Sequence, residues 1–172
     1  MSFRFDKAFE ILLENEGGFS NEAFDPGGRT LYGITEAYDP DAFAAMYALY
    51  LEGKLDEAKE IAKQAYEKKY WKTQYEDIKD SSLAFKVFDL GVNVGPKTIV
   101  RMLQGVLNEF QQNLTLDGIF GPATLNAIAD VDPEELYTKF IARVEIYYRS
   151  LSTFNVFGKG WLRRLHARHW LD

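Results

Sequence analysis

Cysteine is absent from this sequence of 172 residues, and histidine occurs only twice. The absence of cysteine excludes disulfide bonds and thiol chemistry. The two histidines, His166 and His169, lie three positions apart with no third ligand nearby in the sequence, so we expect no metal site and no cofactor. No apolar run approaches the roughly 20 residues that a helix needs to cross a membrane, so we expect no integral membrane segment.

Basic residues are fewer than acidic ones, which gives the chain a formal net charge of −6. Residues 138–172 are the exception, with seven Lys or Arg and two acids. An acidic chain disfavours generic nucleic-acid binding, so we expect no nucleic-acid partner. With 47% hydrophobic and 15% aromatic residues, the chain can bury a substantial core. We expect a monomer, built as one domain or as two closely packed lobes.

The first candidate for a catalytic group is a glutamate at the end of the first predicted helix. Phe5, Phe9 and Leu12 recur at helical spacing, and one more turn of that stripe brings in Glu16. A carboxyl group on the apolar side of a helix resists ionisation, because desolvation penalises its charged form. A general acid needs such an environment. Gly17-Gly18 then ends the helix, since glycine accepts the left-handed cap geometry.

A second acid follows in a glycine-rich turn. Asp25-Pro26-Gly27-Gly28 is a turn signal between residues 19–24 and 30–35, and this pattern predicts a β-hairpin or ribbon. Asp25 would then lie at or beside the turn, where it can be brought back over the end of the helix that carries Glu16.

Three submotifs in this stretch resemble, in the same order, the signature of family 108 glycoside hydrolases. They are Glu16-Gly17-Gly18-Phe19, then Asp25-Pro26-Gly27-Gly28-Arg29-Thr30, then Tyr32-Gly33-Ile34-Thr35. Members of that family are N-acetylmuramidases found among phage lysins and bacterial proteins, some of them labelled secretion activators. The resemblance implies a mainly α (α+β), lysozyme-like fold with a small hairpin or ribbon after the first helix.

The order of acid, aspartate and threonine also resembles the catalytic series of phage-type lysozymes. Asp25 follows Glu16 by nine positions, and Thr30 follows Asp25 by five where that pattern usually has six. The resemblance implies that Glu16 is the general acid, that Asp25 and Thr30 stabilise charge or position water, and that the partner is a peptidoglycan glycan strand. Tyr32 could stack on sugar rings there, or could simply pack against the protein.

The remainder of the chain is predicted to be mostly helical. Prolines 40, 96, 122 and 133 stand where helices would begin, because proline is tolerated at the first helical position. The predicted helices after the ribbon cover residues 40–50, 55–72, 81–93, 96–111, 122–129, 133–151 and 157–169. No linker-like segment separates the first 95 residues from the rest. We therefore expect a catalytic part at 1–95 and a helical part at 96–172, packed as one compact body.

The predicted helix at 81–93 is apolar almost all round, which is typical of a buried helix. Its polar residues Lys86, Asp89 and Asn93 occupy one narrow sector. Because unpaired buried polar groups are costly, this sector must face either an internal network or the substrate. We keep both alternatives: Asp89 and Asn93 line the substrate cleft, or Asp89 pairs inside the core.

The second half of the chain resembles a peptidoglycan-binding module. Residues Asp117 to Thr124 contain the DGxxGxxT loop of such modules, which could touch sugar or could serve only to connect two helices. Near the C-terminus, Arg163, Arg164 and Arg168 could attract an anionic wall polymer or phospholipid. Alternatively, these cations favour the negative end of a helix dipole while neighbouring aromatic residues anchor the segment.

The resulting hypothesis is a lysozyme that hydrolyses peptidoglycan. Two alternatives remain: a lytic transglycosylase that uses Glu16 alone, and a non-catalytic wall-binding or secretion-accessory protein. The first residues carry charges within their apolar part and no small-residue cleavage site, so we expect no signal peptide. Synthesis in the cytoplasm and action on the wall in the periplasm would then require a release route, which for a phage lysin would be a holin.

Overall fold

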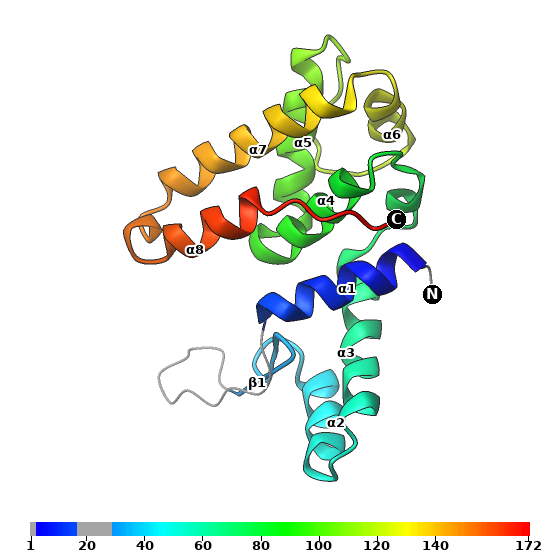
Figure 1. The fold of residues 1–172 in the computed structure, drawn as a ribbon, viewed down its shortest axis with the longest axis vertical. Coiled ribbons are helices and arrows are strands. Elements are labelled where there is room, and N and C mark those ends of the chain that lie inside the picture. Colours follow the sequence, from blue (N-terminus) through cyan, green and yellow to red (C-terminus); the bar gives the residue numbers. More distant parts are fainter. Residues whose placement is uncertain (1–2, 17–28) are drawn as a thin grey trace. The chain divides into compact units, whose positions relative to one another are not determined.

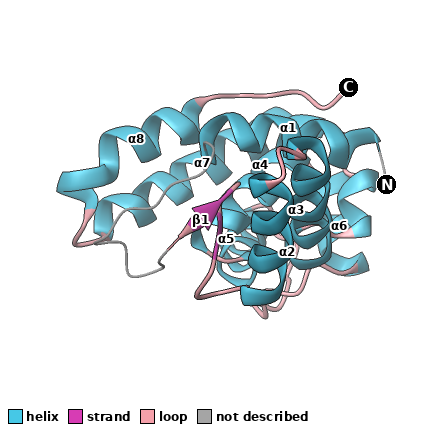
Figure 2. Ribbon diagram, turned by 90° about the horizontal axis from the view of Figure 1, so that it is seen from below, coloured by secondary structure: helices cyan, strands magenta, loops and turns pink. Residues whose placement is uncertain are grey.

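The computed structural model describes residues 3–16 and 29–172, apart from the side chains of Asn15 and Glu16. Its chain divides into two compact units, Met1–Trp71 and Lys72–Asp172. Helices dominate both units, and a two-stranded ribbon follows the first helix (Figures 1 and 2). The predicted mainly α fold with a small ribbon is therefore confirmed.

The first unit contains three described helices and the ribbon. Its elements are α1 (Phe3–Glu16), β1 (Thr30–Leu31), β2 (Ile34–Thr35), α2 (Pro40–Leu51) and α3 (Leu55–Tyr70). The predicted apolar stripe of α1 is buried, with Phe5, Phe9 and Leu12 each no more than 1% exposed. Phe5 packs on Trp71 and Phe9 packs on Tyr66, so the stripe holds α1 against the end of α3.

The second unit contains a short 3-10 helix and five α-helices. They are η1 (Thr73–Asp77), α4 (Ser81–Val94), α5 (Pro96–Glu109), α6 (Pro122–Ala129), α7 (Pro133–Ser150) and α8 (Phe154–His166). Helix α4 packs on α5, α5 packs on α7, and α7 packs on α8, with the last two side by side in Figure 1. The all-round apolar helix is buried as predicted, from Ser81 to Gly91.

Two local predictions about helix ends have clear outcomes. All four prolines named above occupy the beginning of a helix, and Asp132 caps α7 by accepting a hydrogen bond from the Glu135 amide at 2.8 Å. The last helix was predicted three residues too late at both ends, since α8 covers Phe154–His166. Its chain leaves the helix at Ala167, in an extended conformation, because the following residues make contacts elsewhere.

Those following residues form a C-terminal strap, defined here as residues 167–171. The Arg168 guanidinium bonds both oxygens of Glu134 at 2.8 Å and the Ser82 hydroxyl at 2.9 Å. The Leu171 amide donates to Ser81 Oγ at 3.1 Å, and the Leu171 side chain is fully buried. The strap thus ties the chain after α8 to the first turn of α4.

Candidate active site and its relatives

Glu16 is the last residue of α1, as the sequence predicts. Its side chain lies outside the described part of the structure, and so does Asp25, which falls within residues 17–28. Their assignments as acid and as second carboxylate therefore stay predictions. The described residues that flank them begin at Arg29 and form the ribbon.

The ribbon is a tighter hairpin than the sequence suggested. Thr30 pairs with Thr35 and Leu31 pairs with Ile34, so the turn is Tyr32-Gly33. Both turn residues have positive φ, 50° and 76°, the geometry of the two-residue turns that match the twist of a hairpin. The hairpin is thus formed within Thr30–Thr35, which folds back on itself, whereas the turn predicted at Asp25–Gly28 lies outside the described residues and stays a prediction.

Two threonines occupy paired positions on the two strands of this hairpin. Thr30 and Thr35 are directly paired, and the Oγ1 atom of each is buried without a hydrogen-bond partner among the described residues. A hydroxyl can donate one hydrogen bond and accept two, so each is able to hold a water molecule or a sugar hydroxyl. Thr30 is thus chemically suited to the task predicted for it, and Thr35 has the same capacity.

The base of the ribbon is held by a charged clamp. The Arg29 guanidinium bonds Glu36 at 2.9 and 2.6 Å, and the Glu36 amide donates to the Arg29 carbonyl at 2.9 Å. The guanidinium also lies 4.6 Å from the Tyr47 ring centroid and 5.2 Å from that of Phe43, so it joins the ribbon to α2. The hydrogen bond from Arg29 holds the pKa of Glu36 below its ordinary value.

Arg29 lies within the second submotif, but the sequence predicts no role for it. The signal was available, because Arg29 and Glu36 flank the Thr30–Thr35 pair symmetrically once the turn is set at Tyr32-Gly33. Without the turn at Tyr32-Gly33, the sequence does not reveal this cross-strand pair of opposite charges.

Tyr32 is held at both its backbone and its side chain. Its hydroxyl donates to the Leu55 carbonyl at 3.4 Å, and its own carbonyl accepts from the Tyr66 hydroxyl at 3.3 Å. Burial, and then the nearby Asp56, raises the pKa of its phenol. These contacts attach the hairpin turn to α3, which agrees with the packing alternative. Its role in binding sugar stays a prediction.

Asp89 and Asn93 lie in the second unit, on α4, and their surroundings differ. Asp89 is 1% exposed and accepts from Arg164 Nε at 2.9 Å, while Lys86 Nζ lies 3.8 Å from its second oxygen. This corresponds to the interior alternative, pairing inside the core. Asn93 is exposed, so it is the member of the pair whose side chain reaches solvent.

The loop from Asp117 to Thr124 is organised by a buried glutamine. Gln104 donates to Asp117 at 2.8 Å and to the Ile119 carbonyl at 3.2 Å, and its side-chain oxygen accepts from the Gly118 amide at 3.0 Å. The Gln104 hydrogen bond holds the pKa of Asp117 below its ordinary value. The polar atoms of Asp117 and Gly118 thus fix the shape of this loop against α5, as the connecting alternative predicts.

Among the described residues, no group of three or more His, Asp or Glu side chains is placed to hold a metal ion. His166 bonds Glu145 at 2.9 Å, and the His169 ring packs against Phe85. Nor does any described helix combine the length and apolar character that a membrane crossing requires.

Comparisons with known proteins match both halves of the chain. Residues 9–95 match the sequence model of the family described as Glycosyl hydrolase 108, and residues 98–166 match a family described as Predicted Peptidoglycan domain. A solved structure, "Structure of Brucella abortus SagA", superposes with a TM-score of 0.69 at 28% identity, covering 94% of this chain and 88% of that one. No curated protein sequence matches.

The chain therefore belongs to the glycosyl hydrolase 108 family and is a glycoside hydrolase with a C-terminal peptidoglycan-binding half. The family resemblance identified from Glu16-Gly17-Gly18, Asp25 to Thr30 and Tyr32 to Thr35 is confirmed. Its general activity is that of a peptidoglycan hydrolase.

Proposed function

We propose that this hydrolase is an N-acetylmuramidase that cleaves the β-1,4 bond between N-acetylmuramic acid and N-acetylglucosamine in the bacterial cell wall. The observation that carries the proposal is the presence, in one chain, of a glycoside-hydrolase match over residues 9–95 and a peptidoglycan-domain match over residues 98–166. The first match contains the submotifs of Glu16, Asp25 and Thr30. The second match supports peptidoglycan as the polymer on which these residues act.

In the proposed reaction, Glu16 protonates the glycosidic oxygen as that oxygen leaves the anomeric carbon. A glycosidase needs a second group on the opposite side of the sugar, which either activates water or stabilises the oxocarbenium-like transition state. We assign this task to Asp25, which would take the proton of the attacking water. Thr30 supports the assignment, because its Oγ1 atom has no described protein partner and can hold that water.

Substrate contacts outside the reacting centre are proposed for Tyr32 and Asn93. Tyr32 is fixed by two hydrogen bonds, so its position would cost little entropy to maintain when sugar binds. Asn93 is exposed and carries both a donor and an acceptor for sugar hydroxyls. For Asp89, contact with substrate would require its pair with Arg164 to open, so we propose an indirect role in holding α4 in place.

The decisive test compares Glu16→Gln with Glu14→Gln, a neighbouring exposed glutamate on the same helix. Turbidity loss of purified peptidoglycan is followed for both variants and for wild type. Removing a general acid lowers the rate by about 100-fold to 10,000-fold, so Glu16→Gln should be nearly inactive with little change in melting temperature. Glu14→Gln should behave as wild type, and equal activity of all three proteins would overturn the assignment of Glu16.

The products separate hydrolysis from the transglycosylase alternative. Hydrolysis leaves reducing muramic-acid ends, whereas a transglycosylase leaves 1,6-anhydro ends, and mass spectrometry of the digest distinguishes them. We expect reducing ends. The anomer released first also reports geometry, since carboxyl groups about 6.5–9.5 Å apart give inversion and groups about 5–5.5 Å apart give retention.

The role of water is tested with Asp25→Asn and Thr30→Val. If Asp25 activates water, Asp25→Asn should lose as much activity as Glu16→Gln, whereas a purely electrostatic role gives a smaller loss. Thr30→Val preserves the shape of the side chain and removes its hydroxyl, so it should lower kcat with little loss of stability. Thr35→Val, across the ribbon, shows whether loss of the other buried hydroxyl lowers kcat as well, and a loss confined to Thr30→Val would support the assignment of Thr30.

A further inference from the structure

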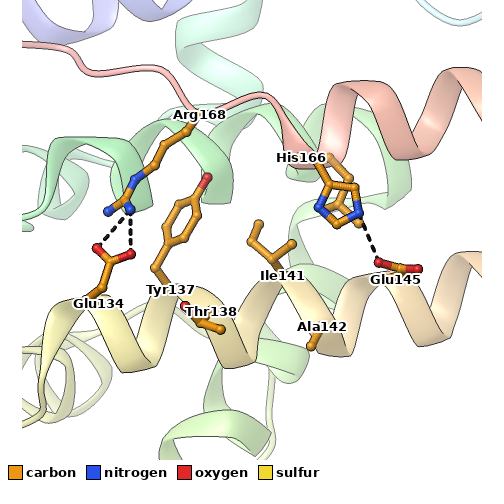
Figure 3. Close-up of a pocket in the computed structure, with 9 residues that line it drawn as sticks. Glu134, Tyr137, Thr138, Ile141, Ala142, Glu145, His166 and Arg168 are labelled. Carbon is orange, nitrogen blue, oxygen red and sulfur yellow. Dashed lines mark hydrogen bonds and ion pairs between the residues drawn. The ribbon is translucent and has the colours of Figure 1, made fainter.

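A pocket of about 360 Å³ lies between α7 and α8, wholly within the second unit (Figure 3). Its volume falls in the range of small-ligand sites. The residues that line it are Glu134, Tyr137, Thr138, Ile141, Ala142, Glu145, Leu165, His166 and Arg168. None of them is a candidate catalytic residue, so the pocket is distinct from the candidate active site.

Each end of the pocket carries a charged pair. At one end both oxygens of Glu134 accept from Arg168 at 2.8 Å, and at the other Glu145 bonds His166 at 2.9 Å (Figure 3). A hydrogen bond from Arg149 holds the pKa of Glu145 below its ordinary value, so this carboxylate is ionised at neutral pH. Each end therefore holds a charged group that a ligand would share with its partner in the protein.

The middle of the pocket is apolar and is lined by small side chains. Ile141 and Leu165 form a buried floor, at 7% and 0% exposure. Thr138 and Ala142 are exposed on α7 one helical turn apart and leave room above that floor. A ligand that fits must therefore be charged at its ends and carry small apolar groups between them.

Length gives a second constraint. Glu134 and Glu145 are eleven residues apart on one helix, which corresponds to about 16 Å at a rise of about 1.5 Å per residue. An extended peptide advances about 3.3 Å per residue, so about five residues span the same distance.

We propose that this pocket binds the stem peptide of peptidoglycan, an inference that rests on the proposed function for the identity of the polymer. The glycan strand is uncharged between its peptide branches, whereas the stem carries free carboxylates, an ammonium group on its diamino acid, and alanine methyls. Arg168 and His166 face the carboxylates, Glu145 faces the ammonium group, and the Ile141–Leu165 floor receives the methyls.

The aromatic residue in the pocket also disfavours sugar. Sugar rings bind by stacking on an open aromatic face, but the Arg168 guanidinium lies 4.1 Å from the centroid of the Tyr137 ring and covers it. The hydroxyl of Tyr137 is buried, and burial raises its pKa to about 12, so it brings no charge to the pocket at neutral pH.

The test is calorimetric titration of the full chain with a synthetic five-residue stem peptide that contains alanine, γ-linked glutamate and a free-amine diamino acid. Wild type should bind, and Ala142→Trp, which fills the pocket, should weaken binding at least about tenfold. Ile146→Trp is the matched control, because Ile146 is exposed one turn further along α7 and does not line the pocket. It should bind as wild type does.

A second pair of measurements keeps the inference testable if Ala142→Trp disturbs the fold. Glu145→Gln is close to wild type in shape. It should weaken binding of the free-amine peptide more than it weakens binding of a peptide whose diamino acid is acetylated. Absence of binding by wild type, or equal effects on both peptides, would overturn the pocket assignment. Neither result touches the muramidase proposal, which stands or fails on Glu16-dependent hydrolysis of glycan.

Discussion

Lys86 places an amine where bulk water does not reach. Its side chain is 1% exposed, its Nζ donates to the Arg164 carbonyl at 2.7 Å, and Asp89 lies 3.8 Å away. Burial lowers the pKa of Lys86 to about 8, against a smaller opposing effect of Asp89. The charge of this residue therefore changes over an accessible pH range.

The unfolding free energy should reveal this titration. Lysine in the unfolded chain has a pKa near 10.5, so between about pH 8 and 10.5 the unfolded state holds more protons and wild-type stability rises with pH. Below pH 8 the cost of burying the charge is present in full. Relative to Lys86→Met, wild type should gain up to about 3 kcal/mol across this window, measured by urea unfolding at several pH values.

The comparison with Lys86→Met cancels titrations shared by both proteins, among them those of Tyr137 and Tyr148, whose pKa values burial raises to about 12. A difference in stability that stays constant from pH 7 to 10 would contradict the assignment of a lowered pKa to Lys86.

At the scale of elements, the loop between α5 and α6 contains two glycines that differ in whether a side chain could replace their hydrogen. Gly118 has a φ of +75°, and a Cβ there would meet the Lys97 carbonyl oxygen at 2.6 Å. Gly121 has a φ of −123° and open space around its Cβ position. The first glycine is required by the fold, whereas the second is not.

Alanine substitution should separate the two positions. Gly118→Ala should destabilise the protein by more than about 1 kcal/mol, because left-handed backbone costs that much even before the clash with Lys97. Gly121→Ala should lie within about 0.5 kcal/mol of wild type in thermal or urea unfolding. Equal losses would mean that the loop relaxes around an added methyl group.

Elements whose ends are determined by neighbouring residues could be predicted from the sequence. Elements determined by contacts between distant residues could not. Prolines such as Pro96 and Pro133 mark helix starts because their ring geometry acts within one turn. The ribbon pairs only two residues per strand, too few for alternation to reveal its register, so the sequence pattern does not predict the turn at Tyr32-Gly33. The five-residue η1 has no period to detect.

The candidate site shows the same division. The order of Glu16, Asp25 and Thr30 is readable as a motif, but the pairing of Asp89 with Arg164 joins residues 75 positions apart. A charged residue in an apolar helix indicates that a partner exists without indicating which one. The end of α8 was misplaced for the same reason, because Arg168 leaves helical geometry to reach Glu134 and Ser82.

For the whole molecule, the boundary between compact units differs from the boundary between sequence families. The units divide after Trp71, whereas the glycoside-hydrolase match continues to residue 95 and so includes α4. Yet α4 packs on α5, and its Lys86 and Asp89 contact Arg164 of α8. The predicted division at 95/96 would separate these partners.

Two fragments test which of the two boundaries defines a segment that folds on its own. Residues 72–172 should unfold cooperatively on heating, followed by circular dichroism, because they keep α4. Residues 96–172 should not, since they lose Leu83, Phe85, Phe88 and Leu90, each at most 1% exposed. Burial of each such side chain contributes about 1.5–3 kcal/mol, so the loss rivals the 5–15 kcal/mol of a whole domain. Cooperative unfolding of the shorter fragment would support a boundary at 95/96.

The C-terminal strap has a consequence for biosynthesis. Ser81 leaves the ribosome 90 residues before Leu171, the residue whose amide it binds. At about 5–20 residues per second, roughly 5 to 20 s of translation pass before that bond can form. Through this interval α4, apolar on nearly every side, is without the α8 and strap residues that cover its first turns. During translation, the apolar side chains of α4 that these residues later cover are therefore exposed to water, and such exposed surface promotes aggregation.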